Sequence, residues 1–215
     1  MLSAAWKLAL LPALVVAPAV SAQTTPAATQ TAPATQQTAP AATPDTAATP
    51  APAASPAAVK VEDQDSFTVV GVTVRTNNDA EASGQGKIPE LWQNAMTSGQ
   101  LDQIPNRVGD GMVVVYSDYA TDGSGDFTYP LGVRVSSADK IPDGMVKRVI
   151  PTGKYAVVQS DQGPPQEVIP ALWQHIAQMT PQQLGGTRSY QTDFEIYPPI
   201  TDPGTMQMTA HIGVK

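Results

Sequence analysis

The residue of this 215-residue chain best placed for chemistry is an acid inside an apolar segment, Glu195. It stands in TDFEIY, between Phe194 and Ile196. Because side chains alternate between the two faces of a strand, Asp193, Glu195 and Tyr197 are expected on one face. A carboxylate with apolar neighbours is costly unless it is paired, so it either takes up a proton or binds a cation. The alternative is a glutamate at a strand end that faces water.

A second region of the chain repeats the surroundings of this acid. IPELWQ at 88–93 and IPALWQ at 169–174 match at five of six positions and lie 81 residues apart. The same spacing joins Tyr116 to Tyr197. It also joins Gly123 to Gly204, Thr128 to Thr209 and Gly132 to Gly213. A register held over this length, with only two copies, predicts a tandem duplication that folds as a pseudo-twofold pair.

The two copies differ at the acid, because Val114 stands where the second copy has Glu195. A nearly symmetric protein thus places a carboxylate on one side and a hydrophobe on the other, between the equivalent Tyr116 and Tyr197. Aromatic faces next to a carboxylate attract a cation by roughly 0.5–2 kcal/mol each. These residues therefore predict a site for a cationic ligand.

Three further aromatic residues are candidates for the walls of this site, namely Trp92, Trp173 and Tyr129. The two tryptophans belong to the repeated motif, and Tyr129 lies in an alternating segment. An amphipathic ring suits a ligand wall and a half-buried core position equally well. Plain packing in the core is the alternative for all three, and for the two tyrosines beside the acid.

The elements that must position these residues follow from hydrophobic periodicity. Each copy is expected to fold as strand, helix, strand and strand, with halves of about 61–140 and 141–215. The expected strands are 66–76, 111–119 and 127–135 in the first half, and 148–160, 189–197 and 206–214 in the second. The proline of each IPxLWQ motif is expected in the first turn of its helix, where its missing N–H is not needed. The predicted fold class is α+β, an antiparallel sheet with two helices.

The chain before residue 61 has a different composition. Residues 1–22 combine Lys7, an apolar run and a small-residue site, VSA, as in a secretory signal peptide. Residues 23–60 are rich in Pro, Ala and Thr and are expected to be a disordered linker. The sequence thus predicts an exported protein, periplasmic or secreted, with one domain at 61–215.

Several function classes find no support in the composition. There are 12 Lys and Arg against 19 Asp and Glu, a net charge of −7, and no basic cluster typical of nucleic-acid binding. The chain has no cysteine, and its two histidines, His175 and His211, lack metal-ligand spacing. No catalytic residue, metal or cofactor is assigned, and a binding role is favoured over an enzymatic one.

These motifs together resemble a known family. IPELWQ, IPALWQHI and SYQTDFEIY, with the ending HIGVK, resemble the GyrI-like effector-binding domains over nearly all of 61–215. Those domains include the ligand-binding half of some AraC-type regulators and the stand-alone integron-cassette effector-binding proteins. The resemblance implies a duplicated βαββ fold with a cleft for lipophilic, often cationic small molecules. Its buried central glutamate falls on Glu195. This chain departs from the regulators in two ways, because no helix–turn–helix is expected before the domain and residues 1–22 predict export, so we expect an exported binding protein without its own DNA-binding domain.

Two other functions stay open. Some GyrI-like relatives hydrolyse strained cyclopropane-bearing compounds, which implies a hydrolase with Glu195 as the base and Tyr116 or Tyr197 orienting the substrate. The third is a ligand-free interaction module that the segment 23–60 tethers to a protein partner.

Overall fold

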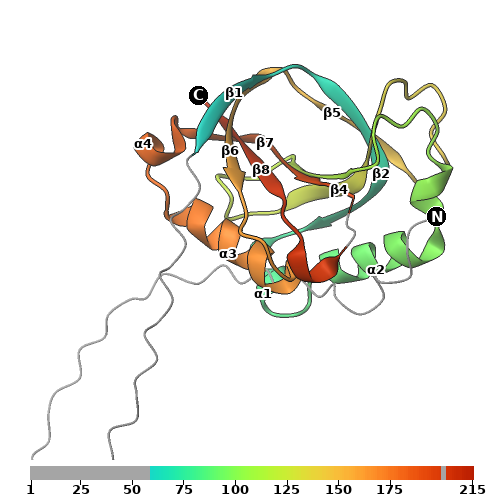
Figure 1. Cartoon of the computed structure of the whole chain (residues 1–215), viewed down its shortest axis with the longest axis horizontal. Helices are drawn as coiled ribbons and strands as arrows, with labels where there is room; N and C mark the ends of the chain where they lie inside the picture. The colour runs from blue at the N-terminus through green and yellow to red at the C-terminus, as the bar shows by residue number, and fades with distance from the viewer. Residues whose placement is uncertain (1–58, 200–201) are drawn as a thin grey trace, which may run out of the picture. The chain divides into compact units, whose positions relative to one another are not determined.

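The strands of this protein form one antiparallel sheet (Figure 1). The computed structural model describes residues 59–199 and 202–215. Within them lie β1 (Lys60–Gln64), β2 (Phe67–Thr76), β3 (Met112–Ser117), β4 (Phe127–Val135), β5 (Val146–Ile150), β6 (Gly153–Gln159), β7 (Arg188–Tyr197) and β8 (Thr209–Val214). Their order in the sheet is β1-β6-β8-β7-β3-β4-β2-β5, and every neighbouring pair is antiparallel. The α+β class is confirmed. The expected signal peptide and nearly all of the expected linker lie outside the described residues.

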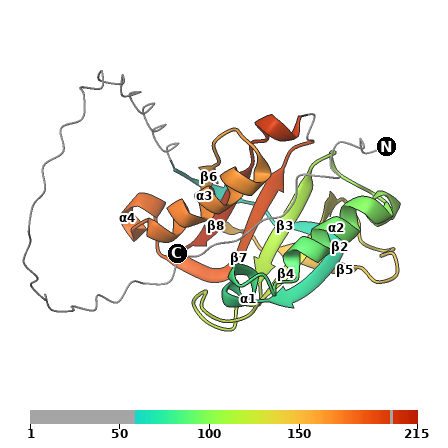
Figure 2. The ribbon, with the colours of Figure 1, turned by 90° about the horizontal axis from the view of Figure 1, so that it is seen from below.

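Two main helices, α2 (Ile88–Ser98) and α3 (Pro165–Gln178), cover the same face of the sheet (Figure 2). α2 has Pro89 in its first turn, as expected, and ends at Gly99 in the left-handed conformation. The expected start of α3 at its IPxLWQ motif is wrong, because Pro165 already opens the helix and Pro170 lies inside it. Two short helices, α1 (Asn78–Ala82) and α4 (Pro181–Leu184), were not expected, and neither were the 3-10 turns η2 (Gln100–Gln103) and η3 (Pro203–Thr205). No helix in the described part of the chain is long and apolar enough to cross a membrane.

The chain itself joins the two ends of the sheet. Only two residues separate β1 from β2, and Pro151 and Thr152 alone separate β5 from β6. β1 pairs with β6 and β2 pairs with β5 in one continuous register. Across the gap, the Ser66 backbone N–H donates to Thr152 Oγ1 at 3.1 Å. The sheet therefore closes into a ring, in which the long β1–β2 segment arches over one side (Figure 1).

The structure corrects one strand expected from the sequence. The single strand expected over 148–160 is two strands, because Pro151 has no N–H to offer the ladder. β1 starts at Lys60, next to the expected start of the domain at 61. The sequence around β1 carries four polar or charged residues in five, KVEDQ, so it gives no strand signal.

Both faces of the central strands are buried, each under a separate core. The larger core lies between the sheet and the two helices. The smaller core fills the inside of the ring, where Phe67 of β2 meets Phe194 of β7 edge-on at 5.3 Å between ring centroids. β3 and β4 separate these two strands in the sheet, so the contact requires the sheet to curl toward this face. β3 is consequently buried along its whole length, which explains its continuous apolar run MVVVYS.

The strand order has a twofold character. It reads as its own reverse when β1–β4 are exchanged with β5–β8. At the centre of the sheet β3 pairs with β7, and Val114 lies directly opposite Glu195, the residue 81 positions later. The axis of a twofold rotation that exchanges the two halves therefore passes between these two residues.

Candidate functional site

Glu195 lies in the middle of β7, on the face that the helices cover, and is fully buried with 0% of its surface exposed. Three side chains donate hydrogen bonds to its carboxylate. Oε1 accepts from Trp173 Nε1 at 2.5 Å and from the Tyr116 hydroxyl at 3.2 Å. Oε2 accepts from the Tyr197 hydroxyl at 2.8 Å. The alternative of a strand-end glutamate that faces water is thus excluded.

The surroundings of Glu195 bring the pKa of its carboxyl close to neutral pH. Burial raises its pKa to about 7, although the hydrogen bonds from Trp173, Tyr197 and Tyr116 act in the opposite direction. Burial, and next the charge of Glu195, also raise the pKa of Tyr116 and Tyr197 well above 10, so both hydroxyls stay protonated donors. Within residues 59–199 and 202–215 no Lys or Arg forms a salt bridge with Glu195. The acid is therefore hydrogen-bonded but lacks a counter-cation among these residues.

The other predicted residues complete one aromatic cluster around this acid. Trp92 of α2 donates its indole N–H to the Tyr129 hydroxyl at 2.9 Å. Trp92 also packs edge-on against Tyr197 at 5.3 Å, and Tyr129 packs edge-on against Tyr116 at 5.1 Å. The structure thus brings together all six residues singled out in the sequence, which we call the Glu195 cluster: Glu195, Tyr116, Tyr197, Trp92, Trp173 and Tyr129.

A cavity of about 210 Å³ adjoins this cluster. Its walls are Asn78, Tyr116, Tyr119, Asp122, Gly123, Phe127, Trp173, Ala177, Arg188 and Tyr190. Two of these, Tyr116 and Trp173, also hydrogen-bond to Glu195, so they stand between the cavity and the carboxylate. Trp92, Tyr129 and Tyr197 do not line it and are almost completely buried.

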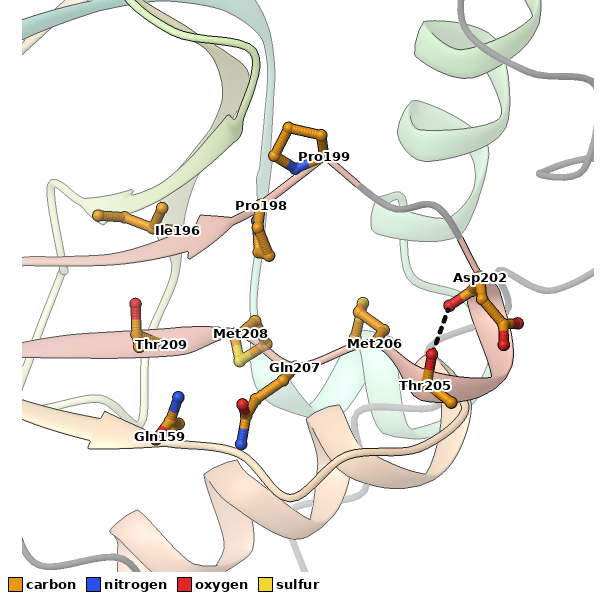
Figure 3. Close-up of a pocket in the computed structure, with 10 residues that line it drawn as sticks. All are labelled: Gln159, Ile196, Pro198, Pro199, Asp202, Thr205, Met206, Gln207, Met208 and Thr209. Atoms are coloured by element: carbon orange, nitrogen blue, oxygen red, sulfur yellow. Dashed lines mark hydrogen bonds between the residues drawn. The ribbon is translucent and has the colours of Figure 1, made fainter.

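A larger cavity, of about 380 Å³, lies where β7 ends and β8 begins (Figure 3). Its ten lining residues include Ile196, Pro198 and Met208 but no aromatic ring. Its one acid, Asp202, is engaged in the 3-10 turn that follows, where its Oδ1 accepts from the Gly204 backbone N–H at 2.8 Å. Size alone therefore does not mark the functional site, and the smaller cavity has the chemistry.

The structure adds an ion pair that the sequence patterns missed. Arg188 Nη2 lies 2.6 Å from Asp193 Oδ2, and Asp193 is fully buried. Asp193 also accepts from the Tyr119 hydroxyl at 2.7 Å and from the Gly213 backbone N–H at 2.8 Å. An odd separation of five would place the two charged residues on opposite faces of a regular strand. A β-bulge between them, with Tyr190 at a φ of 51°, brings them together.

Comparison with known proteins gives this architecture a class, the effector-binding domains, which take up small molecules. The chain belongs to the family of integron-associated effector binding proteins, because the model of that family, Cass2, matches residues 60–214. The fold resemblance stated from the sequence is thereby confirmed. Within residues 59–199 and 202–215 no cluster of acidic residues and histidines could hold a metal ion.

Individual relatives match most of the domain. The integron cassette protein VCH_CASS2 of Vibrio cholerae is 23% identical, with a TM-score of 0.59 over 74% of this chain and 97% of its own. SAV2435 bound to tetraphenylphosphonium is 18% identical, with a TM-score of 0.60 over 73% of this chain and 93% of its own. At these identities both structures show a shared fold. The protein YobU of Bacillus subtilis (strain 168) is 25% identical over 147 residues, which are 67% of this chain and 90% of YobU.

We predict that Glu195→Gln changes how stability depends on pH. Below pH 4.5 the carboxyl is protonated in both the folded and the unfolded chain. Between about 4.5 and 7 it ionises only in the unfolded chain, so the wild type loses stability as the pH rises and the variant does not. The free energy of unfolding of the variant relative to the wild type should thus rise by about 3 kcal/mol across this window.

Urea unfolding from pH 4 to 8 measures this difference. Burial lowers the pKa of His211 to about 4, which makes stability increase with pH in part of the same window. That contribution is common to both proteins and cancels in the comparison. Parallel curves for wild type and variant would contradict a raised pKa at Glu195.

Proposed function

We propose that this protein binds a lipophilic organic cation, with the Glu195 carboxylate as its counter-charge and the aromatic rings that line the 210 Å³ cavity, Tyr116 and Trp173 among them, as its walls. The observation that carries this proposal is a fully buried acid that has no counter-cation among residues 59–199 and 202–215. A buried charge without a partner is costly, so binding a cation there would relieve the cost of ionising the acid. SAV2435, which shares the fold, is a protein seen bound to tetraphenylphosphonium, a cation of this class.

The route to the acid runs through the 210 Å³ cavity. Tyr116 and Trp173 form its inner wall, and both donate to Glu195. Trp173 is only half-buried, whereas its counterpart Trp92 is 2% exposed. A cation that reaches Glu195 therefore displaces the Trp173 indole N–H from the carboxylate and keeps the aromatic faces as its neighbours. Each ring face would contribute roughly 0.5–2 kcal/mol to binding.

We predict that affinity for tetraphenylphosphonium depends on the ionisation of Glu195. With a pKa of about 7, only the ionised fraction attracts the cation. The dissociation constant should accordingly be about thirtyfold larger at pH 5.5 than at pH 8.5. Isothermal titration calorimetry at both pH values measures the ratio.

Two variants give this measurement its controls. Glu195→Gln should abolish tight binding at both pH values, because the amide carries no charge. Glu90→Gln removes an exposed acid from the surface of α2 and should leave affinity and its pH dependence unchanged. A dissociation constant that does not change with pH in the wild type would refute the role of Glu195.

We further propose that the two halves arose by duplication and that the acid is confined to one of them. The neighbours of Glu195 support this, because Trp173, Tyr116 and Tyr197 correspond at a spacing of 81 to Trp92, Tyr197 and Tyr116 around Val114. The opposite half thus holds the same set of donors without an acid.

The exchanged variant Val114→Glu/Glu195→Val tests this equivalence. If the halves are equivalent, the moved carboxylate finds a matching tryptophan and two tyrosines, and tetraphenylphosphonium affinity should stay within about tenfold of the wild type. Val114→Glu alone would put two acids side by side, so one of them should stay protonated at neutral pH. Loss of binding in a folded exchanged variant would argue that the halves are not interchangeable.

We propose in addition that the protein is exported, on the sequence of residues 1–22 alone. Their charged start, apolar run of 13 residues and VSA site have the order of a secretory signal peptide. The mature chain should then begin at Gln23. N-terminal sequencing of the protein purified from its native host decides this, since a chain that retains residues 1–22 contradicts cleavage.

A further inference from the structure

A cation of the protein's own already lies next to the Glu195 cluster. The guanidinium of Arg188 is bound to Asp193, with Nη2 at 2.6 Å and Nε at 3.2 Å from Oδ2. Asp193 precedes Glu195 by two residues, so both acids project from the same face of β7. In the part of the chain that the structure describes, one of these two neighbouring buried acids has a cation and the other has none.

Three aromatic rings surround this guanidinium. Its ζ-carbon lies 4.6 Å from the ring centroid of Tyr190, 5.5 Å from that of Trp173 and 5.9 Å from that of Tyr119. A cation within about 6 Å of a ring centroid is attracted to the ring. Aromatic rings and a carboxylate are also the groups that would hold a ligand cation at Glu195. Trp173 belongs both to the Glu195 cluster and to the rings around Arg188. We call these three rings the Arg188 cage.

The backbone is built to hold this cage. Tyr190 has a φ of 51°, which is the left-handed region that a bulky residue rarely adopts. Its ring lies against Gly123, where an added Cβ would come within 2.8 Å of Tyr190 Cε1. Local strain of this kind persists where the surrounding structure imposes it, and it concentrates at functional sites. The strained bulge is what turns Arg188 toward Asp193.

We propose that Arg188 is a tethered competitor of the ligand, whose guanidinium fills the Arg188 cage in the free protein and must leave when a ligand cation binds. The inference rests on the proposed function. Arg188, Tyr190 and Trp173 all line the 210 Å³ cavity, so an entering cation meets this positive charge before it reaches Glu195. The Arg188 side chain is 19% exposed and long enough to turn into solvent.

This arrangement selects among cations. When the guanidinium leaves, it uncovers the cage and the Asp193 carboxylate, and the ligand must replace both sets of contacts. A cation with several aromatic rings can do so, whereas a small quaternary ammonium ion offers too little surface. Arg188 thereby determines specificity and excludes small cations from the site.

The test compares dissociation constants for tetraphenylphosphonium and tetramethylammonium at pH 8.5, where Glu195 is ionised. Arg188→Gln removes the competitor, so tetraphenylphosphonium should bind at least about tenfold more tightly, as expected when a blocked state is removed. Tetramethylammonium should bind to this variant in the millimolar range and show no measurable binding to the wild type. A merely structural role for Arg188 predicts weaker binding by the variant. Tighter binding by Arg188→Gln therefore distinguishes a competitor from a structural residue.

Two further variants keep the result interpretable. Arg188→Gln/Asp193→Asn leaves no unpaired buried acid to destabilise the fold, and it should bind tetraphenylphosphonium more tightly than the wild type but less tightly than Arg188→Gln. Arg107→Gln breaks the Arg107–Asp102 pair, which does not line the cavity, and should bind as the wild type does.

The outcomes separate this inference from the function on which it rests. Wild-type binding with no tightening in either Arg188 variant overturns the inference and leaves the proposed function standing. Equal tightening in Arg107→Gln would overturn it as well, because general loss of positive charge would then explain the gain. If no protein in the series binds tetraphenylphosphonium, the proposed function fails and the inference fails with it.

Discussion

The burial of one carboxylate that has no counter-cation in the described part of the chain is the constraint on which the site depends. Glu195 is held by three donors from three elements, Trp173 of α3, Tyr116 of β3 and Tyr197 of β7. Hydrogen bonds to a buried acid favour its ionised form, but here burial outweighs them and its pKa stays near 7. The protein therefore keeps this acid at the point where modest changes around it decide whether it carries a charge.

The ring-shaped sheet makes such burial possible. A sheet with one face in water would leave the central strands half-exposed, whereas here the helices cover one face and the curled sheet encloses the other. β3 is consequently buried along its whole length, as is the part of β7 around Glu195, and the aromatic residues that project from these two strands find partners on both helices. The central position of these strands in the sheet thus both buries Glu195 and brings its neighbours into contact with the helix side chains.

Much of the site could be predicted from the sequence because two regular periods determine it. Strand alternation placed Glu195 and Tyr197 on one face, and the 81-residue repeat related Trp92 to Trp173 and Tyr116 to Tyr197. These residues contact one another as expected, while their role in ligand binding stays a prediction.

What could not be predicted depends on departures from those periods. The bulge at Tyr190 joins Arg188 to Asp193 across an odd spacing, and no pattern of period two can reveal it. The closure of the ring was missed for a related reason. The polar strand β1 lacks an apolar alternation, and its pairing with β6 depends on residues more than 85 positions away.

The place of the Val114–Glu195 pair at the centre of the sheet has an evolutionary consequence. In a symmetric homodimer, any residue on the twofold axis faces its own copy, so an acid there would face a second acid about 4.5–5.5 Å away. Two carboxylates so close cannot both ionise, and the dimer would carry a shared proton at its centre. Joining both halves in one polypeptide removes that restriction, because each half can then mutate alone. A single chain can thus place one charge on one side of the twofold axis and make the site there asymmetric, which a pair of identical subunits cannot do.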